Sequence, residues 1–208
     1  MDFSGIKLVD IGNTHAKIYH DKKVTTIKAE DFNLKEKFYY ISVNSKLNRV
    51  LKENKDAINI EKYITLKTSY SGLGVDRKVL CSYIDDGVIV DAGSAITIDV
   101  MQNKEHKGGY ILPGIKSYFD SYENISPALK VDRDDLIMIE TLPQNTFEAI
   151  NKAVIKSIVM MIKDVSKDKK IYFCGGDGRM LSNYFEGAIY KKDLIFDAMK
   201  KIIKDSKC

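Results

Sequence analysis

The sequence has no tryptophan, only three prolines and three cysteines, and no long apolar run. With 44% hydrophobic and 30% charged residues, such a chain is typical of an ordered globular protein. The longest apolar candidate, AVIKSIVMMI, is interrupted by Lys156 and falls short of the about 18 residues that a membrane helix needs. We therefore expect a folded protein with no membrane partner.

The cysteines give no sign of a disulfide framework. Cys81, Cys174 and Cys208 form no CxxC pair, and their number is odd. No stretch reads as a signal peptide either, so we expect a reducing compartment and a cytoplasmic location.

Charge is nearly balanced, with 33 Lys and Arg against 29 Asp and Glu and a formal net charge of +4. The basic residues are scattered, whereas nucleic-acid binding usually requires a cluster, so we expect no nucleic-acid partner. His15, His20 and His106 are not spaced as metal ligands. We interpret each of the three as a surface or strand residue.

The periodicity of apolar residues predicts an α/β protein. Strands are expected at residues 5–12, 16–20, 23–29, 37–43, 87–100 (with a turn inside), 109–113 and 170–174. A first helix is expected to begin at a Ser45 cap with Leu47, Val50 and Leu51 on one face. Further helices are predicted after residue 74, at 192–205, and as a long amphipathic helix from Asn145, where Asn145 and Glu148 resemble a capping box; Met160 and Met161 are expected in its core.

One pattern occurs twice. LVDIGNTHAKIY and IVDAGSAITIDV both give Val-Asp-x-Gly, then a polar residue, then a small residue and an extended run. The recurrence indicates an internal duplication at half-domain scale, with lobes at residues 1–84 and 85–208 and a cleft between them.

The first glycine turn suits an anion. Gly12 allows a tight turn with open amides, Asn13 and Thr14 add short polar groups, and Lys17 adds charge from the next strand. Because a bare carboxylate repels phosphate, we assign Asp10 to organising a metal-bound nucleotide. An ordinary Asx-type turn at a strand end is the competing interpretation.

The second turn has a similar composition. Asp91 is followed by Ser94 and Thr97 around a small Ala95, which suits close approach by a ligand. The paired glycines at 108–109 and the CGGDG stretch at 174–178 are expected at strand ends, where glycine weakens a fold unless a backbone must come close. Four such turns point to a nucleotide-sized ligand.

The stretch GVDR, residues 74–77, opens a helix. Asp76 is either a first-turn acid favoured by the helix dipole or the general base for a substrate hydroxyl. Arg77 is either a surface cation or the group that binds an anionic substrate or the migrating phosphoryl group. Tyr70 lines a substrate pocket or lies on a plain surface loop.

The order of these motifs, DIGNTHAK, GLGVDR, VDAGSAITID, GGYILPGI, NTFEAI and YFCGGDG, resembles the type III pantothenate kinases of the acetate and sugar kinase, Hsp70 and actin superfamily. The resemblance implies a duplicated ribonuclease-H-like fold with two lobes and a central nucleotide cleft. It also implies a homodimer that transfers the γ-phosphoryl group of ATP to the primary hydroxyl of pantothenate, the first step toward coenzyme A.

The resemblance also implies roles for single residues. Asp76 would accept the proton, and Asp91 would bind potassium or ammonium beside the magnesium that accompanies ATP. The expected ATP contacts are Asp10, Ile11, Gly12, Asn13, Thr14, His15, Ala16, Lys17 and Ser94. The expected pantothenate contacts are Tyr70, Gly74, Val75, Asp76, Arg77 and Thr146.

Three positions depart from the family pattern. Ser94 replaces a common Thr, His15 a common Arg, and Ala153 a frequent Gly. The loss of one fixed positive charge at His15 bears on nucleotide affinity. Two alternatives to the kinase remain: a nucleotide-binding regulator without phosphotransfer, which should lack Asp76, and an ATPase acting on a partner protein, which should carry long insertions.

Overall fold

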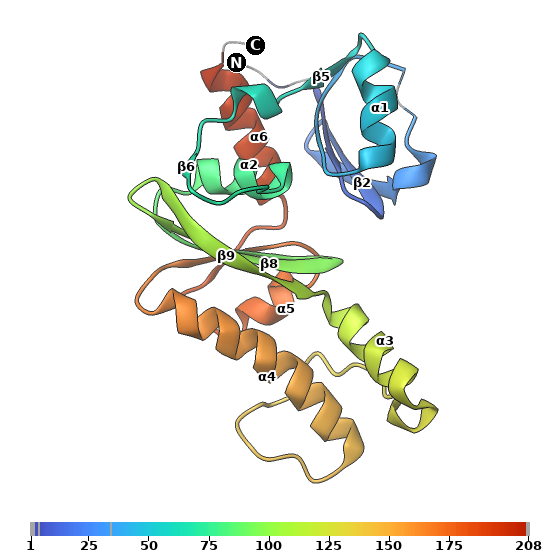
Figure 1. The fold of residues 1–208 in the computed structure, drawn as a ribbon, viewed down its shortest axis with the longest axis vertical. Helices are drawn as coiled ribbons and strands as arrows, with labels where there is room; N and C mark the ends of the chain where they lie inside the picture. Colours follow the sequence, from blue (N-terminus) through green and yellow to red (C-terminus); the bar gives the residue numbers. More distant parts are fainter. Residues whose placement is uncertain (1–2, 4, 34, 207–208) are drawn as a thin grey trace. The chain divides into compact units, whose positions relative to one another are not determined.

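A computed structural model describes residues 3, 5–33 and 35–206 of the chain (Figure 1). It has two compact units. Unit 1 comprises Met1–Asp85, Asn103–His106 and Asp193–Cys208, and unit 2 comprises Asp86–Gln102 and Lys107–Lys192. Cys81 and Cys174 are buried and form no disulfide among the described residues, whereas Cys208 lies outside them.

Unit 1 is built on a five-stranded sheet in the order β3-β2-β1-β4-β5. Strand β1 pairs antiparallel with β2 and parallel with β4. The elements of this unit are β1 (Lys7–Ile11), β2 (His15–His20), β3 (Lys23–Lys28), η1 (Ala29–Asp31), β4 (Phe38–Ser42), α1 (Ser45–Glu53), β5 (Ala57–Asn59), η2 (Glu61–Tyr63), β6 (Lys67–Thr68), α2 (Val75–Tyr83) and α6 (Leu194–Asp205).

Unit 2 contains a sheet in the order β11-β10-β7-β8-β9. Strand β7 pairs antiparallel with β8 and parallel with β10. Its elements are β7 (Gly87–Ala92), β8 (Ala95–Gln102), β9 (Glu105–Pro113), α3 (Ile115–Ile125), η3 (Pro127–Leu129), α4 (Thr146–Ser166), β10 (Ile171–Cys174), α5 (Gly178–Ser182) and β11 (Ile189–Tyr190). The first two residues of β9 belong to unit 1, where they pair with β6.

The two sheets repeat one topology. In each, the first strand has its hairpin partner and a third strand on one side and two parallel strands on the other. Along the chain, helix α1 connects the two parallel strands β4 and β5 in unit 1, and α5 connects β10 and β11 in unit 2. This confirms the predicted α/β class and its duplicated, ribonuclease-H-like plan. The exact division of the duplication after residue 84 stays a prediction.

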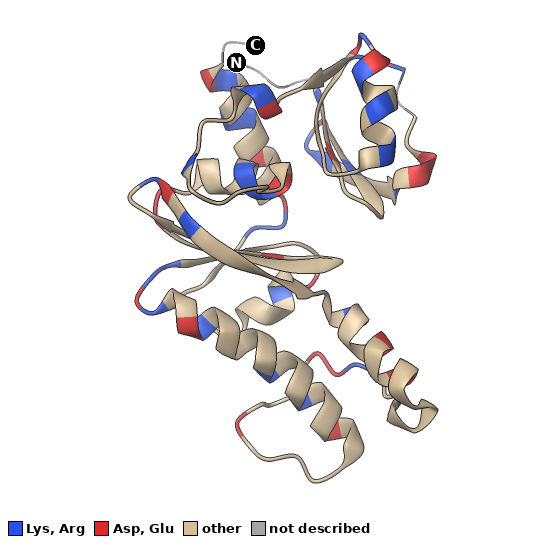
Figure 2. Ribbon diagram, viewed as in Figure 1, with Lys and Arg blue, Asp and Glu red and all other residues tan. Residues whose placement is uncertain are grey.

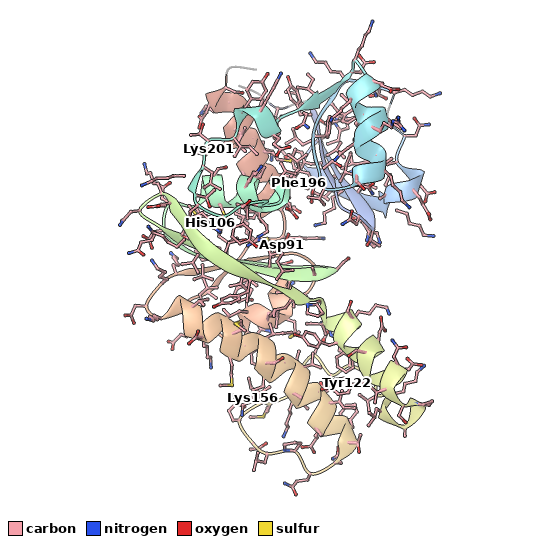
Figure 3. The ribbon with its side chains drawn as sticks, viewed as in Figure 1. Asp91, His106, Tyr122, Lys156, Phe196 and Lys201 are labelled. Atoms are coloured by element: carbon pink, nitrogen blue, oxygen red, sulfur yellow. The ribbon has the colours of Figure 1, made fainter. Side chains whose placement is uncertain are left out.

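Burial explains why the first strand of each sheet is apolar. Leu8 and Val9 in β1 are consecutive and both fully buried, as are Val88 and Ile89 in β7, so each strand is covered on both faces. Each such side chain contributes about 1.5–3 kcal/mol to folding. In unit 1, the C-terminal helix α6 returns to cover the sheet, with Phe196 tilted against the ring of Tyr19 at 5.5 Å (Figure 3).

Most predicted elements are confirmed, including the capping box at the start of α4. There the Asn145 side chain accepts a hydrogen bond from the Glu148 amide at 2.9 Å and donates to the Glu148 carboxylate at 3.0 Å. The predicted cap of α1 was wrong. Asn44 caps that helix with 3.1 Å bonds to two amides, and Ser45 is its first residue, because an amide oxygen placed one residue earlier reaches both donors.

Three burial and strand predictions were also wrong. Val50 is exposed and does not share a buried face with Leu51, and Met160 is exposed on α4 rather than in its core. Gly108 and Gly109 lie inside β9 and not at its entry, because β9 extends back to Glu105 to pair with β6.

Figure 2 shows acidic and basic residues on the helices of both units, with α1 mostly basic. On α4, for example, Lys152 forms an ion pair with Glu148 at 3.0 Å one turn earlier. Among the described residues, no helix combines the length and the apolar character needed to cross a membrane.

Candidate functional site

The Asp10 turn, residues 10–17, connects β1 to β2. The Gly12 amide donates to the His15 carbonyl at 2.9 Å, which leaves Asn13 and Thr14 at the tip. Asp10 lies directly across the ladder from Lys17, and its carboxylate is 3.8 Å from the Lys17 ammonium. The carboxylate therefore has a local cation that moderates its repulsion of an anion.

The N-cap of α1 also holds this turn. The Asn44 side-chain amide donates to the carbonyls of Gly12 at 3.3 Å and Asn13 at 3.5 Å, while its oxygen caps the helix. One buried side chain thus fixes the turn against the N-terminus of α1, the end of a helix that favours anions.

A pocket of about 570 Å³ lies beside the turn, lined by Asn13, Thr14, His15, Lys28, Ala29, Glu30, Asn44, Lys46 and Leu47. Lys28 is the cross-strand partner of His15, and Lys46 is in the first turn of α1. The first turn of that helix, fully described, contains no acidic residue. The lining thus carries two lysines and one glutamate, and Glu30 is paired with Lys28 at 3.5 Å, so Lys46 supplies the excess positive charge.

The Asp91 turn, residues 91–97, joins β7 to β8 in unit 2. Asp91 (Figure 3) is the second-to-last residue of its strand. Asp10 has the same position in β1. The Gly93 amide donates to the Ala95 carbonyl at 3.0 Å, so Ser94 alone forms the tip. This turn is one residue shorter than the Asp10 turn, and Thr97 occupies the cross-strand position that Lys17 holds in unit 1.

Two other glycines of unit 2 pack against the Asp91 turn. A Cβ on Gly175 would lie 2.3 Å from the Ala92 carbonyl oxygen and 2.5 Å from the Asp91 carboxylate, and a Cβ on Gly114 would lie 2.5 Å from the Gly93 oxygen. Gly175 also has a φ of +80°. Glycine is required at Gly175 and Gly114 because backbone approaches backbone, as the glycine-rich sequence indicated.

Arg133 is a neighbour that the sequence did not reveal. Its guanidinium donates to Asp177 at 2.8 Å and also contacts Asp135. Burial lowers the pKa of Arg133, but the hydrogen bonds and charges of these two carboxylates outweigh burial and raise that pKa above its usual value. The Asp177 amide in turn donates to Ala92 at 3.0 Å, so Arg133 is tied to the Asp91 turn.

The Tyr70 group, defined as Tyr70, Gly74, Asp76 and Arg77, lies at the start of α2. Gly74 is the N-cap, and the Asp76 carboxylate accepts a hydrogen bond from the Arg77 amide at 2.8 Å. Arg77 is only 4% exposed, and its guanidinium carbon is 4.9 Å from the centre of the Tyr70 ring. Arg77 is therefore no free surface cation, and it stacks on the expected substrate tyrosine.

The remaining predicted contacts divide by exposure. Ile11, Ala16 and Val75 are buried, so they can reach a ligand only through their backbone. Thr146 is exposed at the first residue of α4, in unit 2. His106 lies in β9 as expected of a strand residue, and it is buried rather than on the surface.

The repeated topology and the two aspartate turns define the class of this protein: an α/β protein with a duplicated ribonuclease-H-like fold. A sequence model of the type III pantothenate kinases matches residues 56–168. The chain is 48% identical to a type III pantothenate kinase of Campylobacter jejuni, over 96% of this chain and 97% of the relative. It is 45% identical to one of Helicobacter hepaticus, over 95% and 98%. The chain belongs to the type III pantothenate kinase family.

A solved structure from Campylobacter jejuni, of a protein whose name assigns it to a Baf family of transcriptional activators, is also similar. It is 46% identical, with a TM-score of 0.91 over 97% of this chain and 98% of that one. The fold is therefore shared along nearly the whole sequence.

Proposed function

We propose that this protein transfers the γ-phosphoryl group of ATP to the primary hydroxyl of pantothenate, giving 4'-phosphopantothenate, the first step of coenzyme A synthesis. The observation that carries the proposal is the 48% identity with a type III pantothenate kinase over nearly the full length of both chains. The presence of Asp76 beside a buried Arg77 at the start of α2 supports a catalytic role over that of a regulator.

Asp76 is the proposed general base. Phosphoryl transfer requires positioning, charge stabilisation and one acceptor for the alcohol proton. The hydroxyl oxygen of pantothenate forms the new bond to the γ-phosphorus as the bond to ADP breaks, and the hydroxyl proton passes to the Asp76 carboxylate. Tyr70, Gly74, Val75, Arg77 and Thr146 are the proposed pantothenate contacts, with Arg77 binding the carboxylate of the substrate.

The Asp10 turn is the proposed phosphate site, with contacts from Asp10, Ile11, Gly12, Asn13, Thr14, His15, Ala16 and Lys17, and with Ser94 of unit 2 as a further ATP contact. Lys28 and Lys46 line the pocket next to His15. Glu30 offsets the charge of Lys28, so Lys46 supplies the positive charge near the position where an arginine is absent, and this supports phosphate binding despite that departure.

The residues at the Asp91 turn fit a monovalent cation. The Asp91 carboxylate and the Ala92 carbonyl would be its oxygen ligands, and Gly175 lies so close to both that a Cβ would fill the space. We keep potassium or ammonium at Asp91 as part of the proposal. The cation would supply positive charge beside the nucleotide, whose phosphates also require magnesium.

Two wider features belong to the same proposal. An enzyme that consumes ATP needs the cytoplasmic nucleotide pool, so we propose the cytoplasm as its compartment. We also propose a homodimer, supported by apolar side chains of unit 2 that are exposed in the single chain, among them Leu136 and Met138.

The test is a coupled assay of ADP release with ATP, magnesium and potassium, run with and without pantothenate. We expect release only when pantothenate is present, together with a product that carries one phosphate. ADP release that ignores pantothenate would favour the ATPase alternative. Nucleotide binding without any release would favour the regulator.

A further inference from the structure

A short strand pairing brings a buried histidine to the Tyr70 group. Strand β6 has only two residues, and its Thr68 pairs with His106 of β9. The Thr68 hydroxyl oxygen lies 2.8 Å from His106 Nδ1 and also accepts the Tyr70 amide at 3.0 Å. Thr68 therefore connects the imidazole to the backbone of the tyrosine.

The Thr68 hydroxyl serves both neighbours at once. A hydroxyl carries one proton and accepts through two lone pairs. The Thr68 oxygen therefore accepts the Tyr70 amide and still forms a hydrogen bond with His106 Nδ1, whichever tautomer the imidazole adopts.

Aromatic contacts lead to the same tyrosine. The rings of His106 and Tyr70 are 5.8 Å apart between centroids and tilted by 49°. The guanidinium carbon of Arg77 is 4.9 Å from the centre of the Tyr70 ring. His106 is 1% exposed and Tyr70 is 37% exposed, so the tyrosine is held by buried neighbours while part of its ring remains open to a ligand.

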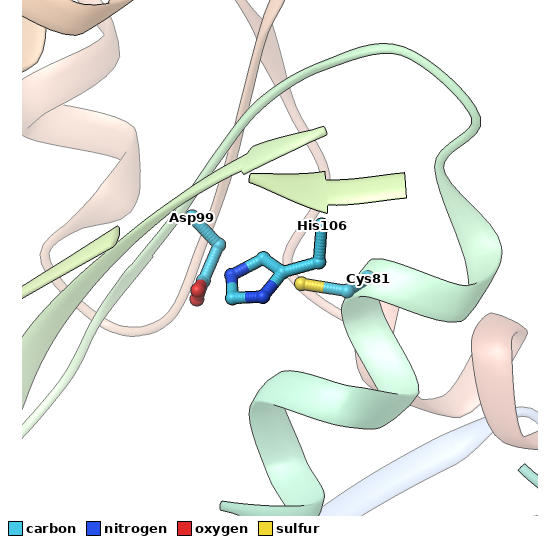
Figure 4. Close-up of side chains that lie close together, drawn as sticks. All are labelled: Cys81, Asp99 and His106. Carbon is cyan, nitrogen blue, oxygen red and sulfur yellow. The ribbon is translucent and has the colours of Figure 1, made fainter. Parts of the chain in front are cut away.

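A further neighbour of the imidazole is on the helix that carries Asp76. Figure 4 shows the His106 side chain beside that of Cys81, which belongs to α2. A ring nitrogen of His106 and the Cys81 sulfur are within 4.8 Å, and both side chains are buried. His106 thus contacts the body of α2 as well as the loop that precedes it.

We propose that His106 and Thr68 are positioning residues for pantothenate: they fix the Tyr70 ring, and Tyr70 fixes the direction of the Arg77 guanidinium. The inference rests on the proposed function of the Tyr70 group. Neither His106 nor Thr68 touches the reacting atoms. A guanidinium binds a carboxylate through directed, paired hydrogen bonds, so a ring that stops Arg77 from turning raises the affinity for the substrate.

Two variants of Thr68 test the hydroxyl link. Thr68→Val keeps the shape and β-branching but removes the hydroxyl, whereas Thr68→Ser keeps the hydroxyl. For Thr68→Val we expect the KM for pantothenate to rise by about tenfold. Misplacing a group of the site by about 1 Å can cost roughly 10²-fold, and a looser Arg77 should cost less than that. The kcat and the KM for ATP should stay near the wild-type values, because only substrate binding is lost. Thr68→Ser should restore most of the affinity.

A variant of His106 gives an independent arm. His106→Phe keeps a ring next to Tyr70 and removes the nitrogen that forms the hydrogen bond with Thr68. If the hydrogen bond is the link, the double variant with Thr68→Val should bind pantothenate about as well as Thr68→Val alone, because that variant has already broken the bond to His106. Additive losses would overturn the link, as would equal KM values for Thr68→Val, Thr68→Ser and the wild type.

Calorimetric titration with pantothenate separates this inference from the proposed function. If wild-type protein binds pantothenate and Thr68→Val binds about tenfold more weakly, the positioning role holds even where no phosphoryl transfer is seen. Equal binding by both overturns the role while leaving the kinase intact. A parallel rise in the KM for ATP, which reports general loss of structure, also counts against it. Wild-type protein that neither binds nor phosphorylates pantothenate overturns both.

Discussion

Asp76 is both a first-turn residue of α2 and the proposed general base. Its carboxylate accepts a hydrogen bond from the Arg77 amide in the first turn of α2, a position that the helix dipole favours. As the proposed base, it must also take a proton. We predict that Asp76→Asn keeps the fold and nucleotide binding and lowers kcat by about 10²-fold or more, because the amide cannot accept that proton.

Steady-state kinetics and calorimetry with ATP measure the two effects of Asp76→Asn separately. The matched control is Asp120→Asn on α3, where an exposed ion pair with Lys116 is lost. The control should keep wild-type turnover. Near-normal turnover of Asp76→Asn would remove the role of general base.

Gly175 gives a prediction on stability. Gly175→Ala places a methyl group 2.3 Å from the Ala92 oxygen at a φ of +80°. The left-handed backbone costs about 1–2 kcal/mol and overpacking a further 1–3 kcal/mol. We expect a fall of about 2–5 kcal/mol in the free energy of unfolding, measured with urea.

The neighbouring glycine is the control for that experiment. A Cβ on Gly176 would meet nothing within 4 Å, so Gly176→Ala should leave the free energy of unfolding nearly unchanged. Equal stability of the two variants would show that the Gly175 turn relaxes at no cost, and would remove the argument for close packing on Asp91.

Asp91 carries the prediction on cations. If its carboxylate binds potassium or ammonium, activity should depend on either ion and fail in sodium alone, because the oxygen ligands around the turn set the preferred ion size. The measurement is ADP release in chloride salts of the three cations at equal ionic strength. Asp91→Asn should weaken the potassium response. Activity that ignores the monovalent ion would refute the assignment.

At the scale of an element, the start of α4 is the most clearly specified. Asn145→Ala removes the acceptor of the 2.9 Å cap bond and should cost about 1 kcal/mol in the free energy of unfolding, whereas Asn145→Asp keeps an acceptor and should cost less. Urea unfolding of both variants measures the difference. Equal losses would mean that the cap bond does not stabilise α4.

Glu148 adds a pH dependence to the same cap. Its pKa is lowered, chiefly by the hydrogen bond from Lys152. A lowered pKa contributes stability that is present above the ordinary carboxyl value and is lost as the pH falls through the lowered value. The Asn145→Ala and wild-type curves should therefore both decline in acid.

Elements whose signals are local were predictable from the sequence. The strand, turn and strand around Asp91 and the capping box at Asn145 need only neighbouring residues. The cap of α1 was missed because Asn44 also serves the distant Gly12 carbonyl, which a local rule does not include. Gly108 was misplaced because a strand far away in the chain, β6, extends β9.

In the candidate site, too, some residues were predictable from local sequence and others were not. The Asp10 and Asp91 turns were visible as repeated sequence. Lys28 enters the pocket only through its pairing with His15, and Arg133 reaches the Asp91 turn only through Asp177. No sequence motif marks Lys28 or Arg133. Strand register places Lys28 in the pocket, and the path of a loop places Arg133 beside Asp177.

At the scale of the whole chain, one topology occurs twice with different turn chemistry. The first turn has two tip residues and a lysine opposite its aspartate, whereas the second has one tip residue and a threonine there. A duplicated scaffold thus presents a turn whose aspartate is balanced by a lysine in unit 1, and an acidic turn with a threonine opposite its aspartate in unit 2. This difference supports the assignment of phosphate contacts to unit 1 and of a cation to Asp91.

Assembly gives the last prediction. In the loop before α4, Ile137 and Ile139 are buried, so the alternate residues Leu136 and Met138 point outward with 85% and 70% of their surface exposed. Large exposed apolar residues on one loop indicate an interface, and we propose a second copy of this chain as the partner.

Sedimentation velocity should show a dimer for the wild type and a monomer for the double variant Leu136→Gln, Met138→Gln. The control is Val50→Gln, which removes an exposed apolar residue of α1 and should leave the dimer intact. A monomeric wild type would contradict the homodimer, and a dimeric double variant would place the interface elsewhere.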